Sequence, residues 1–422
     1  MGTTTNGNPG GYFMPITHVY DPILDAETSF DSDDFKFLQD SGEGVGGPGY
    51  YSNSIVLDPS ELSIYWPSYL PCCRQSKHWK IAENMTKELL DAIYEDSFRE
   101  TQHNRVMPAE LQGASLDVRM RKEAELIATS VKSAAYMFPN ASPVRAGMLS
   151  QSMLLVFLHD DIVESSPLDA LSRIDLKGST ITDAIFATYE PKPGTTQKHR
   201  EAMRSFLTAI IEEDRPLGKR LLSSVLTWLN HTKGYRSISP AVFESLRNYL
   251  DYRSDDIAQE YVSPENAQWD RRRKLYITST RFIITQALFA CNIHLSETEI
   301  HVFNNLLRIY VTHISLTNDL HSFERESEEH ERTGRLLINA IDVIRKVYQV
   351  SPVVAKQLAR GFILDTECAF SGEFKKLISS GLLNSAQIRF AKALAECLAG
   401  QIFYSITSGR YGGDKAARGV CT

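Results

Sequence analysis

Residues 296–326 read SETEIHVFNNLLRIYVTHISLTNDLHSFERE, and this stretch carries most of the information about the fold. It opens with a Ser-x-x-Glu pattern at Ser296 and Glu299, a start signal for helices because the two residues cap each other's backbone amides. Apolar residues then recur at the three- and four-residue spacing of one helix face. The stretch therefore predicts helical structure in which Asn318 and Ser322 directly follow a buried apolar run.

The same helical spacing of apolar residues continues outward, from about Trp79 to Tyr411. Runs that alternate apolar and polar residues, as half-buried strands do, are nearly absent. We therefore expect an all-α fold, a single-domain bundle of roughly ten helices around a central cavity. The further helical stretches are residues 78–97, 119–138, 144–164, 198–214, 243–262, 276–293 and 385–409.

The chain divides into three parts by composition. Residues 1–60 are rich in Gly, Ser, Asp and Pro, and they bury too little apolar surface to offset the entropy of ordering. We expect a flexible tail there, in which a short segment at 35–38 docks on the body. Residues 75–415 form the predicted helical domain, and residues 416–422 form a C-terminal tail.

Composition and charge exclude several classes of protein. The 422 residues include 45 Lys and Arg against 52 Asp and Glu, a net charge of −7, which argues against a nucleic-acid binder because such proteins neutralise phosphates with basic residues. Six scattered cysteines without a CxxC pair predict neither a disulfide framework nor a thiolate zinc site. The start of the chain lacks signal-peptide features, and no run reaches the ~18 apolar residues that span a bilayer. The sequence therefore predicts a cytoplasmic protein without a membrane span.

The first candidate site is the acidic end of an unusually apolar stretch, FLHDDIVES. Asp160 and Glu164 are four residues apart, so both carboxylates lie on one helix face, with Asp161 beside them. Adjacent negative charges disfavour ionisation unless a cation lies between them, and Mg²⁺ suits such a cluster because it prefers oxygen ligands. The alternative is a solvated helix end, which this motif taken alone fits equally well.

The second candidate site is more specific. Asn318, Ser322 and Glu326 follow one another at four-residue steps and form a row of amide, hydroxyl and carboxylate oxygens on one helix face. Such a row can chelate one Mg²⁺, which usually completes its shell with water and substrate phosphate oxygens. Asp319 lies about 100° round the helix and is a less suitable ligand. The alternative, a polar face stabilised by side-chain pairs, does not explain why two indifferent helix formers lie in the middle of a helix.

Basic residues near these motifs are candidates for phosphate binding. Arg410 and Tyr411 follow the last helical stretch, and an arginine beside a phenol suits charge-assisted hydrogen bonds to phosphate. Arg325 directly precedes Glu326 and is a further candidate, although an exposed helix arginine is its simpler interpretation.

These elements, in this order, resemble the motifs of class I terpene synthases, most of all the fungal-type single-domain sesquiterpene and diterpene cyclases. The chain has the family's aspartate-rich motif, its Asn-Asp-x-x-Ser-x-x-x-Glu motif with a basic residue before the Glu, and its terminal Arg-Tyr pair. The resemblance covers about residues 75–415 and leaves the N-terminal tail unexplained. The matching residues are Asp160, Asp161, Glu164, Asn318, Asp319, Ser322, Arg325, Glu326, Arg410 and Tyr411.

The resemblance implies a role for each of these side chains. It implies bound Mg²⁺ ions, three of them with substrate present, with Mn²⁺ as a possible substitute. The implied catalytic residues are Asp160, Asp161, Asn318, Ser322 and Glu326. The implied metal ligands are Asp160, Asp161, Glu164, Asn318, Ser322 and Glu326. The implied diphosphate-binding residues are Arg253, Arg325, Arg410 and Tyr411.

One expected residue departs from the family pattern. The family's diphosphate-sensing arginine lies about 45 residues before the Asn of the second motif, and an Asp follows it by three residues. Arg253 has this neighbour in Asp256 but lies 65 residues before that Asn. Arg272 and Arg273 have the spacing, 46 and 45 residues, in different surroundings. An inserted polar loop at 263–274 accounts for the extra length, so Arg253 is preferred.

The resemblance implies a Mg²⁺-dependent cyclase that ionises an allylic prenyl diphosphate, cyclises the carbocation to a terpene hydrocarbon or alcohol, and releases diphosphate. Farnesyl diphosphate (C15) is the expected substrate, and geranylgeranyl diphosphate (C20) is the alternative. The rivals are a chain-elongating prenyl diphosphate synthase, which would need a second aspartate-rich motif, and a non-catalytic helical scaffold. The expected oligomeric state is a monomer or a homodimer, and the sequence does not distinguish the two.

The chemistry of such a cyclase needs a dry apolar cavity, because water would quench the cation. Met153 and Phe157 lie on the helix that carries the acidic cluster, and Phe403 lies seven residues before Arg410. These three side chains are therefore candidates to line the cavity, where aromatic faces stabilise a cation without reacting with it. Ordinary core packing is the simpler interpretation of each.

Overall fold

The structure is a computed structural model that describes most of the chain. At several helix ends, residues 159–165 of the acidic segment among them, it describes the backbone alone. The described residues are 11–16, 18–23, 35–40, 49–99, 116–165, 197–232, 238–258, 279–334 and 336–411.

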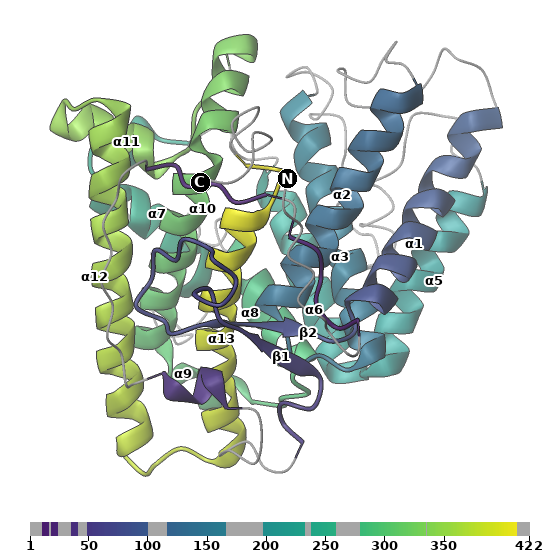
Figure 1. Cartoon of the computed structure of the whole chain (residues 1–422), viewed down its shortest axis with the longest axis horizontal. Helices are drawn as coiled ribbons and strands as arrows, with labels where there is room; N and C mark the ends of the chain where they lie inside the picture. Colours follow the sequence, from purple (N-terminus) through teal and green to yellow (C-terminus); the bar gives the residue numbers. More distant parts are fainter. Residues whose placement is uncertain are drawn as a thin grey trace, which may run out of the picture.

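The described chain is almost entirely helical, which confirms the all-α prediction (Figure 1). In these residues one small sheet pairs β1 and β2 antiparallel, with Leu57 opposite Cys73. No helix in the described ranges is both long and apolar enough to cross a membrane. The elements are η1 (Lys36–Gln39), β1 (Ser54–Leu57), β2 (Cys73–Ser76), α1 (Trp79–Arg99), α2 (Leu116–Met137), α3 (Pro143–Ser165), α5 (Gln197–Glu213), α6 (Arg215–Thr232), η5 (Pro240–Phe243), α7 (Leu246–Ala258), α8 (Ser279–Ala290), α9 (Glu297–His301), α10 (Asn304–Thr333), α11 (Ala340–Tyr348), α12 (Pro352–Ser379) and α13 (Ser385–Thr407).

The helix start predicted at Ser296 is present, and the stretch that follows it divides into two helices. Ser296 Oγ accepts from the Glu299 amide while Glu299 Oε2 accepts from the Ser296 amide at 2.8 Å, so the reciprocal cap begins α9. A turn then leads into α10, which is 30 residues long and ends at Gly334 in the left-handed conformation (φ +69°) that favours glycine. Because α10 packs against α7, α11, α12 and α13, it is a central support of the molecule.

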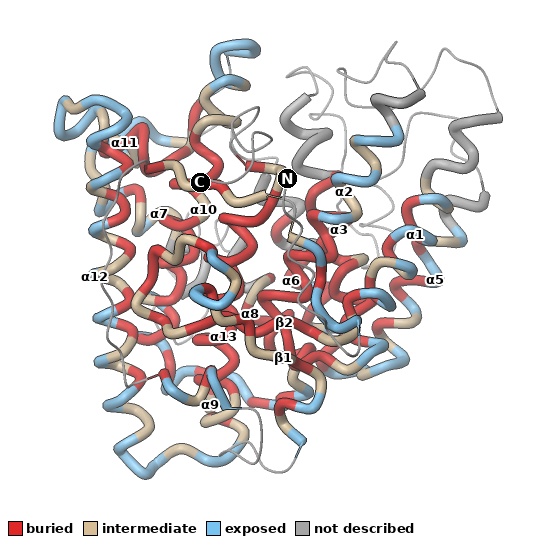
Figure 2. Tube along the Cα trace, viewed as in Figure 1, coloured by how far each residue is buried: buried red, intermediate tan, exposed pale blue. Residues whose placement is uncertain are grey.

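Two clusters of buried apolar side chains hold the helices together, as the red interior in Figure 2 shows. The larger lies among α1, α2, α3, α8 and α13, and the smaller lies between α7, α10, α11 and α12. Both reach α10, which contributes Tyr310 to the first cluster and Leu320 to the second. Gly400 lets α13 approach α2 closely, because a Cβ there would lie 2.0 Å from the Tyr136 carbonyl oxygen.

The described parts of residues 1–60 pack on the helices, and the flexible tail expected for the stretch as a whole stays a prediction. Phe35 and Leu38 are buried in the larger cluster, so the short docking segment predicted at 35–38 is present. The Tyr20 amide donates to the Ile406 carbonyl at 2.7 Å, near the end of α13. A few apolar anchors offset the ordering entropy of a segment whose average composition favours disorder. The domain limits expected from the sequence stay a prediction.

A buried carboxyl group on α13 makes the stability of the fold depend on pH. Glu396 is 1% exposed and accepts from Asn140 Nδ2 at 2.8 Å. Burial raises the pKa of this carboxyl to about 7, although Arg74 and Lys392 oppose the rise. The folded protein therefore holds the proton more tightly than the unfolded chain does. This contribution to stability is lost as the pH rises from about 4.5 to about 7.

We expect Glu396→Gln to remove this dependence, because the amide still accepts from Asn140 but does not ionise. The unfolding free energy of the variant minus that of wild type should therefore rise by on the order of 3 kcal/mol as the pH increases from about 4.5 to about 8. Urea unfolding of both proteins at several pH values in that range measures the difference. A difference that is the same at every pH would contradict the role assigned to Glu396.

Candidate active site

The row of oxygen donors predicted on α10 lies at the edge of the core. This α10 row consists of Asn318, Ser322 and Glu326. Ser322 is 1% exposed, and its Oγ has no hydrogen-bond partner among the described residues. Asn318 and Glu326, one turn before and one turn after it, are half-buried. A buried hydroxyl without a partner costs free energy, which a bound cation would offset. This face of α10 therefore fits a hard divalent cation that prefers oxygen ligands.

Asp319 lies on a different side of α10, toward α7 and α11. Its Oδ2 accepts from Tyr249 Oη at 2.5 Å and from the Ala340 amide at 2.9 Å. Its Oδ1 lies 3.4 Å from Arg253 Nη2 in an ion pair. Burial raises the pKa of Asp319, while Arg253 and the two hydrogen bonds oppose the rise. Asp319 thus ties α7 and the start of α11 to α10.

Glu326 is oriented by a residue that the sequence did not single out. Asn339 Nδ2 donates to Glu326 Oε2 at 3.0 Å and to the Asp319 carbonyl at 2.9 Å. Asn339 is itself fixed, because its Oδ1 accepts from the Ile341 amide at 2.8 Å and caps the start of α11. Burial and the charge of Asp319 raise the pKa of Glu326, and Arg325 opposes the rise. The sequence signal at Asn339 is that of a helix cap, which does not indicate support of a ligand.

The C-terminal pair predicted to bind phosphate meets the row on α10. Asn318 Nδ2 donates to Tyr411 Oη at 3.0 Å, across 93 residues of sequence. Tyr411 is buried and packs edge-on against Tyr404. The Arg410 guanidinium lies 4.9 Å from the centroid of the Phe157 ring on α3. These contacts join α3, α10 and α13, and Figure 1 shows the C-terminal halves of α10 and α13 at the same end of the molecule.

The end of α13 is held from two sides, which fixes the position of this pair. Lys132 Nζ on α2 donates to the Thr407 carbonyl at 2.8 Å, and the Tyr20 amide donates to the Ile406 carbonyl. Both donors bind carbonyl groups that the last turn of a helix leaves without partners. Burial lowers the pKa of Lys132 to about 8, so the capping group is still largely charged near neutral pH.

Three groups predicted to bind diphosphate share one electrostatic environment. Burial raises the pKa of Tyr411, while the positive charges of Arg410 and Arg325 lower it, so both guanidinium groups act on this phenol. Because burial has the larger effect, the phenol stays protonated and can donate a hydrogen bond. The three groups together form a cluster of donors with positive charge beside the α10 row.

The acidic cluster lies on the last turns of α3, where the structure describes the backbone. The side chains of Asp160, Asp161 and Glu164 are outside the described residues. Their segment begins one turn after Phe157, and the Arg410 guanidinium lies over the face of the Phe157 ring. The α3 backbone therefore brings this segment to the end of the molecule that holds the Arg-Tyr pair, and its role in metal binding stays a prediction.

One of the three candidate diphosphate-sensing arginines lies in the described part of the chain. Arg253 is half-buried on α7 and is held beside α10 by its ion pair with Asp319. Arg272 and Arg273 lie outside the described residues, as does the side chain of Asp256. The position of Arg253 is therefore compatible with the role preferred for it, which stays a prediction.

The apolar residues predicted to line a cavity lie in two environments. Phe157 is 8% exposed and stacks on Tyr404 with ring centroids 6.4 Å apart. Met153 lies one turn earlier on α3 and is also 8% exposed. Phe403 is fully buried, with its ring centroid 4.8 Å from that of Tyr136. Phe403 therefore packs between α2 and α13, on a side of the helix about 100° away from Tyr404, and its role in lining a cavity stays a prediction.

Comparison with known proteins places these motifs in a family. Residues 271–367 match the family model described as terpene synthase family 2, C-terminal metal binding, and this range contains the whole α10 row. Terpene cyclase 6 of Gibberella fujikuroi is 30% identical over 361 residues, which cover 85% of this chain and 85% of the relative. Terpene cyclase aneC of Aspergillus aculeatus is 25% identical over 404 residues, which cover 95% of this chain and 82% of the relative.

Solved structures show the same fold. Aristolochene synthase from Penicillium roqueforti matches with a TM-score of 0.52 and 16% identity, over 76% of this chain and 95% of that chain. An α-eudesmol synthase matches with a TM-score of 0.52 and 17% identity, over 79% of this chain and 96% of that chain. On the sequence match to Terpene cyclase 6 and the metal-binding family model, the chain belongs to the terpene cyclase family and is an enzyme of the terpene synthase type.

Proposed function

We propose that this enzyme is a Mg²⁺-dependent cyclase that converts farnesyl diphosphate (C15) to a cyclic terpene hydrocarbon or alcohol and releases diphosphate. The hydrogen bond between Asn318 and Tyr411 carries the proposal, because it joins the α10 row to the C-terminal Arg-Tyr pair. Cleavage of an allylic C–O bond needs both kinds of group, cation ligands and phosphate donors, on one leaving group. A cytoplasmic location and a monomeric or homodimeric state are part of the proposal.

The α10 row is our proposed binding site for one Mg²⁺. Asn318, Ser322 and Glu326 would supply an amide, a hydroxyl and a carboxylate oxygen, and the hydroxyl is buried without another partner. The acidic segment 160–164 would hold further ions, and Mn²⁺ would fit the same oxygen ligands. The bound metal would neutralise negative charge on the diphosphate as the C–O bond breaks.

The basic residues of the chain would bind and orient the diphosphate. We assign binding of the phosphate oxygens to Arg325, Arg410 and the protonated phenol of Tyr411. Arg253 on α7 would also bind them, because its ion pair with Asp319 holds it beside α10. Contacts within the protein hold Arg253, Arg410 and Tyr411 in place before a substrate binds. They therefore stabilise developing charge without reorganisation during the reaction.

The hydrocarbon end of the substrate would lie against aromatic rings. Phe157 and Tyr404 are stacked and nearly buried, and Arg410 lies over the face of Phe157. Aromatic faces attract a carbocation electrostatically and exclude the water that would quench it. Arg410 would thus mark the boundary between the diphosphate and the hydrocarbon chain.

Turnover of defined prenyl diphosphates tests the proposal. The purified full chain is incubated with Mg²⁺ and farnesyl, geranylgeranyl or geranylfarnesyl diphosphate, and hydrocarbon extracts are analysed by mass spectrometry. We expect cyclic C15 products from farnesyl diphosphate, and we expect them to vanish with EDTA. Cyclic C20 products alone would favour the geranylgeranyl alternative, and longer diphosphates would favour a chain-elongating synthase. No consumption of any of the three substrates would overturn the proposal.

The structure also predicts a role for Asn339, which orients Glu326. Asn339→Ala should raise the Mg²⁺ concentration at half-maximal activity by about 10- to 100-fold, with a smaller effect on kcat at saturating metal, because the carboxylate loses its orienting donor. Asn384→Ala is the matched control, since Asn384 caps the start of α13 in the same way but does not contact Glu326. An equal Mg²⁺ requirement in both variants would contradict the orienting role.

A further inference from the structure

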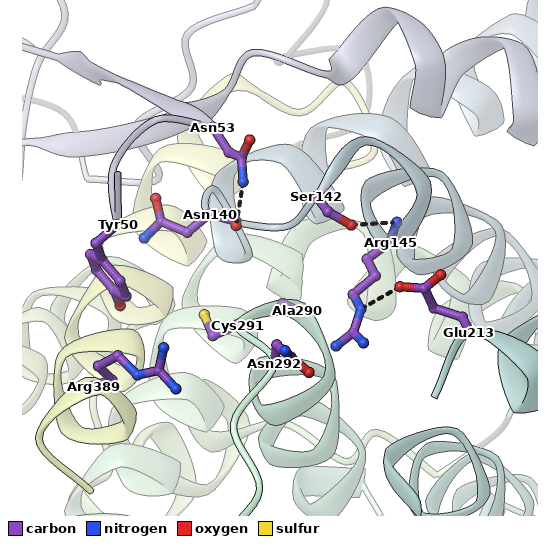
Figure 3. Close-up of a pocket in the computed structure, with 10 residues that line it drawn as sticks. All are labelled: Tyr50, Asn53, Asn140, Ser142, Arg145, Glu213, Ala290, Cys291, Asn292 and Arg389. Carbon is purple, nitrogen blue, oxygen red and sulfur yellow. Dashed lines mark hydrogen bonds and ion pairs between the residues drawn. The ribbon is translucent and has the colours of Figure 1, made fainter. Parts of the chain in front are cut away.

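A polar pocket of about 320 Å³ lies apart from the candidate active site (Figure 3). It is formed where the connection between α2 and α3, the end of α8 and the first half of α13 meet. Arg389 lines it near the start of α13, whereas Arg410 follows the end of that helix. The two arginines are therefore roughly 30 Å apart along the helix axis. The volume is at the lower end of the range for small-molecule sites.

One of the two arginines in this pocket is neutralised by its own contacts. Arg145 Nε donates to Glu213 Oε1 at 2.8 Å, and its Nη2 lies 3.2 Å from Asp214 Oδ2. Its Nη1 donates to the Phe289 carbonyl at 2.6 Å, in the last turn of α8. Arg145 thus serves as a structural cap, and the pocket carboxylate Glu213 is engaged by it.

The other arginine has no such contacts. Arg389 is half-buried and makes no hydrogen bond or ion pair with any residue that the structure describes. In Figure 3 its guanidinium points into the pocket, beside Cys291 and toward the side where Asn292 and Arg145 lie. A partly buried guanidinium has lost part of its hydration, and this costs free energy that no hydrogen-bond acceptor offsets here. The charge of Arg389 is therefore available to a ligand.

Further hydrogen-bond donors surround the same space. Tyr50 Oη is buried and has no hydrogen-bond partner in the described part of the chain. Burial and the charge of Glu396 raise the pKa of Tyr50, and the charge of Arg389 opposes the rise, so the phenol is protonated and can donate. Asn292 lies across the pocket from Tyr50, and its side-chain amide has no partner in the described ranges. Donors thus approach from three segments that are far apart in sequence.

We propose that this pocket binds a small oxyanion, held by Arg389 and the hydroxyl of Tyr50, with Asn292 opposite. Phosphate, diphosphate and polycarboxylate ions share the required chemistry, which is a set of anionic oxygens for a forked guanidinium and neutral donors. An anion is favoured over a cation, because Glu213, the one carboxylate among the lining residues, is already engaged by Arg145. Glu396, which acts on Tyr50 and accepts from Asn140, has a pKa raised by burial to about 7 and is therefore partly protonated near neutral pH. The site is separate from the diphosphate site proposed above.

Calorimetric titration of the metal-free full chain with phosphate, diphosphate and citrate tests this proposal. The protein is freed of metal on an immobilised chelating resin, with no soluble chelator present, so the candidate active site lacks cations and anion binding there contributes little. We expect saturable binding of at least one of the three anions. Arg389→Gln should weaken it at least about tenfold, and Tyr50→Phe by several-fold. Comparison of the three anions separates a phosphate site from a carboxylate site.

Two further variants make the result specific. Arg308→Gln is the matched control, because Arg308 is exposed on α10 and its hydrogen bond goes to Asn305. It should bind the anion as wild type does. Thermal unfolding checks that Arg389→Gln is folded. The proposal is overturned if none of the anions binds, if Arg389→Gln binds as wild type, or if Arg410→Gln weakens binding instead.

Discussion

Replacing Asn318 with alanine is expected to lower kcat/KM on the order of 10³-fold while moving the melting temperature by less than about 4 °C. The substitution removes one oxygen ligand from the α10 row and the donor to Tyr411 Oη, so it affects both sides of the proposed site. Stability should change little, because Asn318 is half-buried and alanine is the better helix former. Steady-state kinetics with farnesyl diphosphate and thermal unfolding measure the two effects.

Asn305→Ala is the matched control for this variant, since Asn305 is an exposed asparagine on the same helix. It should behave as wild type in both measurements. Asp160→Asn probes the other predicted metal-binding segment and should lose activity to a similar degree. Normal turnover by both Asn318→Ala and Asp160→Asn would show that the site is assigned to the wrong residues.

The substitution one residue further on, Asp319→Ala, should act mainly on stability. We expect the free energy of unfolding to fall by about 3–5 kcal/mol, because a buried charge network loses its acceptor. The Tyr249 hydroxyl, the Ala340 amide and the Arg253 guanidinium would all lose a partner. Activity should fall as well, since Arg253 is no longer held beside the α10 row. Chemical denaturation and kinetics at a temperature where the variant is folded separate the two effects.

Two other variants define the role of Asp319. Asp319→Asn keeps the volume and one carbonyl acceptor, so it should lose less stability than the alanine variant. Asp251→Ala on α7 breaks an exposed ion pair with Arg247 and should change stability little. If Asp319→Ala were no more destabilised than Asp251→Ala, the proposed tie between α7, α10 and α11 would be wrong.

The α10 row could be predicted from the sequence because its geometry is local. Once the segment is helical, backbone hydrogen bonds place residues at four-residue steps on one face, and Asn318, Ser322 and Glu326 share it. The cap at Ser296 was readable for the same reason, since its partner Glu299 is three residues away. The turn that separates α9 from α10 was not predicted, because the apolar spacing runs through it without a break.

The N-terminal segment shows what average composition leaves out. Its many Gly, Ser and Asp residues lower the average apolar content and favour disorder. Stability depends on where the few apolar residues pack, and Phe35 and Leu38 reach the larger core cluster. An average over sixty residues does not reveal such anchors, whereas the local apolar residues at 35–38 predicted this one.

The amino-acid order alone indicated that the chain is helical, that it carries two motifs predicted to bind cations, and that an Arg-Tyr pair follows the last helical stretch, because helix periodicity and side-chain chemistry act within a few residues. Packing across long sequence separations settled which of these groups meet. It brought Tyr411 to Asn318, oriented Glu326 through Asn339, and packed Phe403 against Tyr136. Such contacts depend on how whole helices cross, and no local pattern in the sequence encodes that.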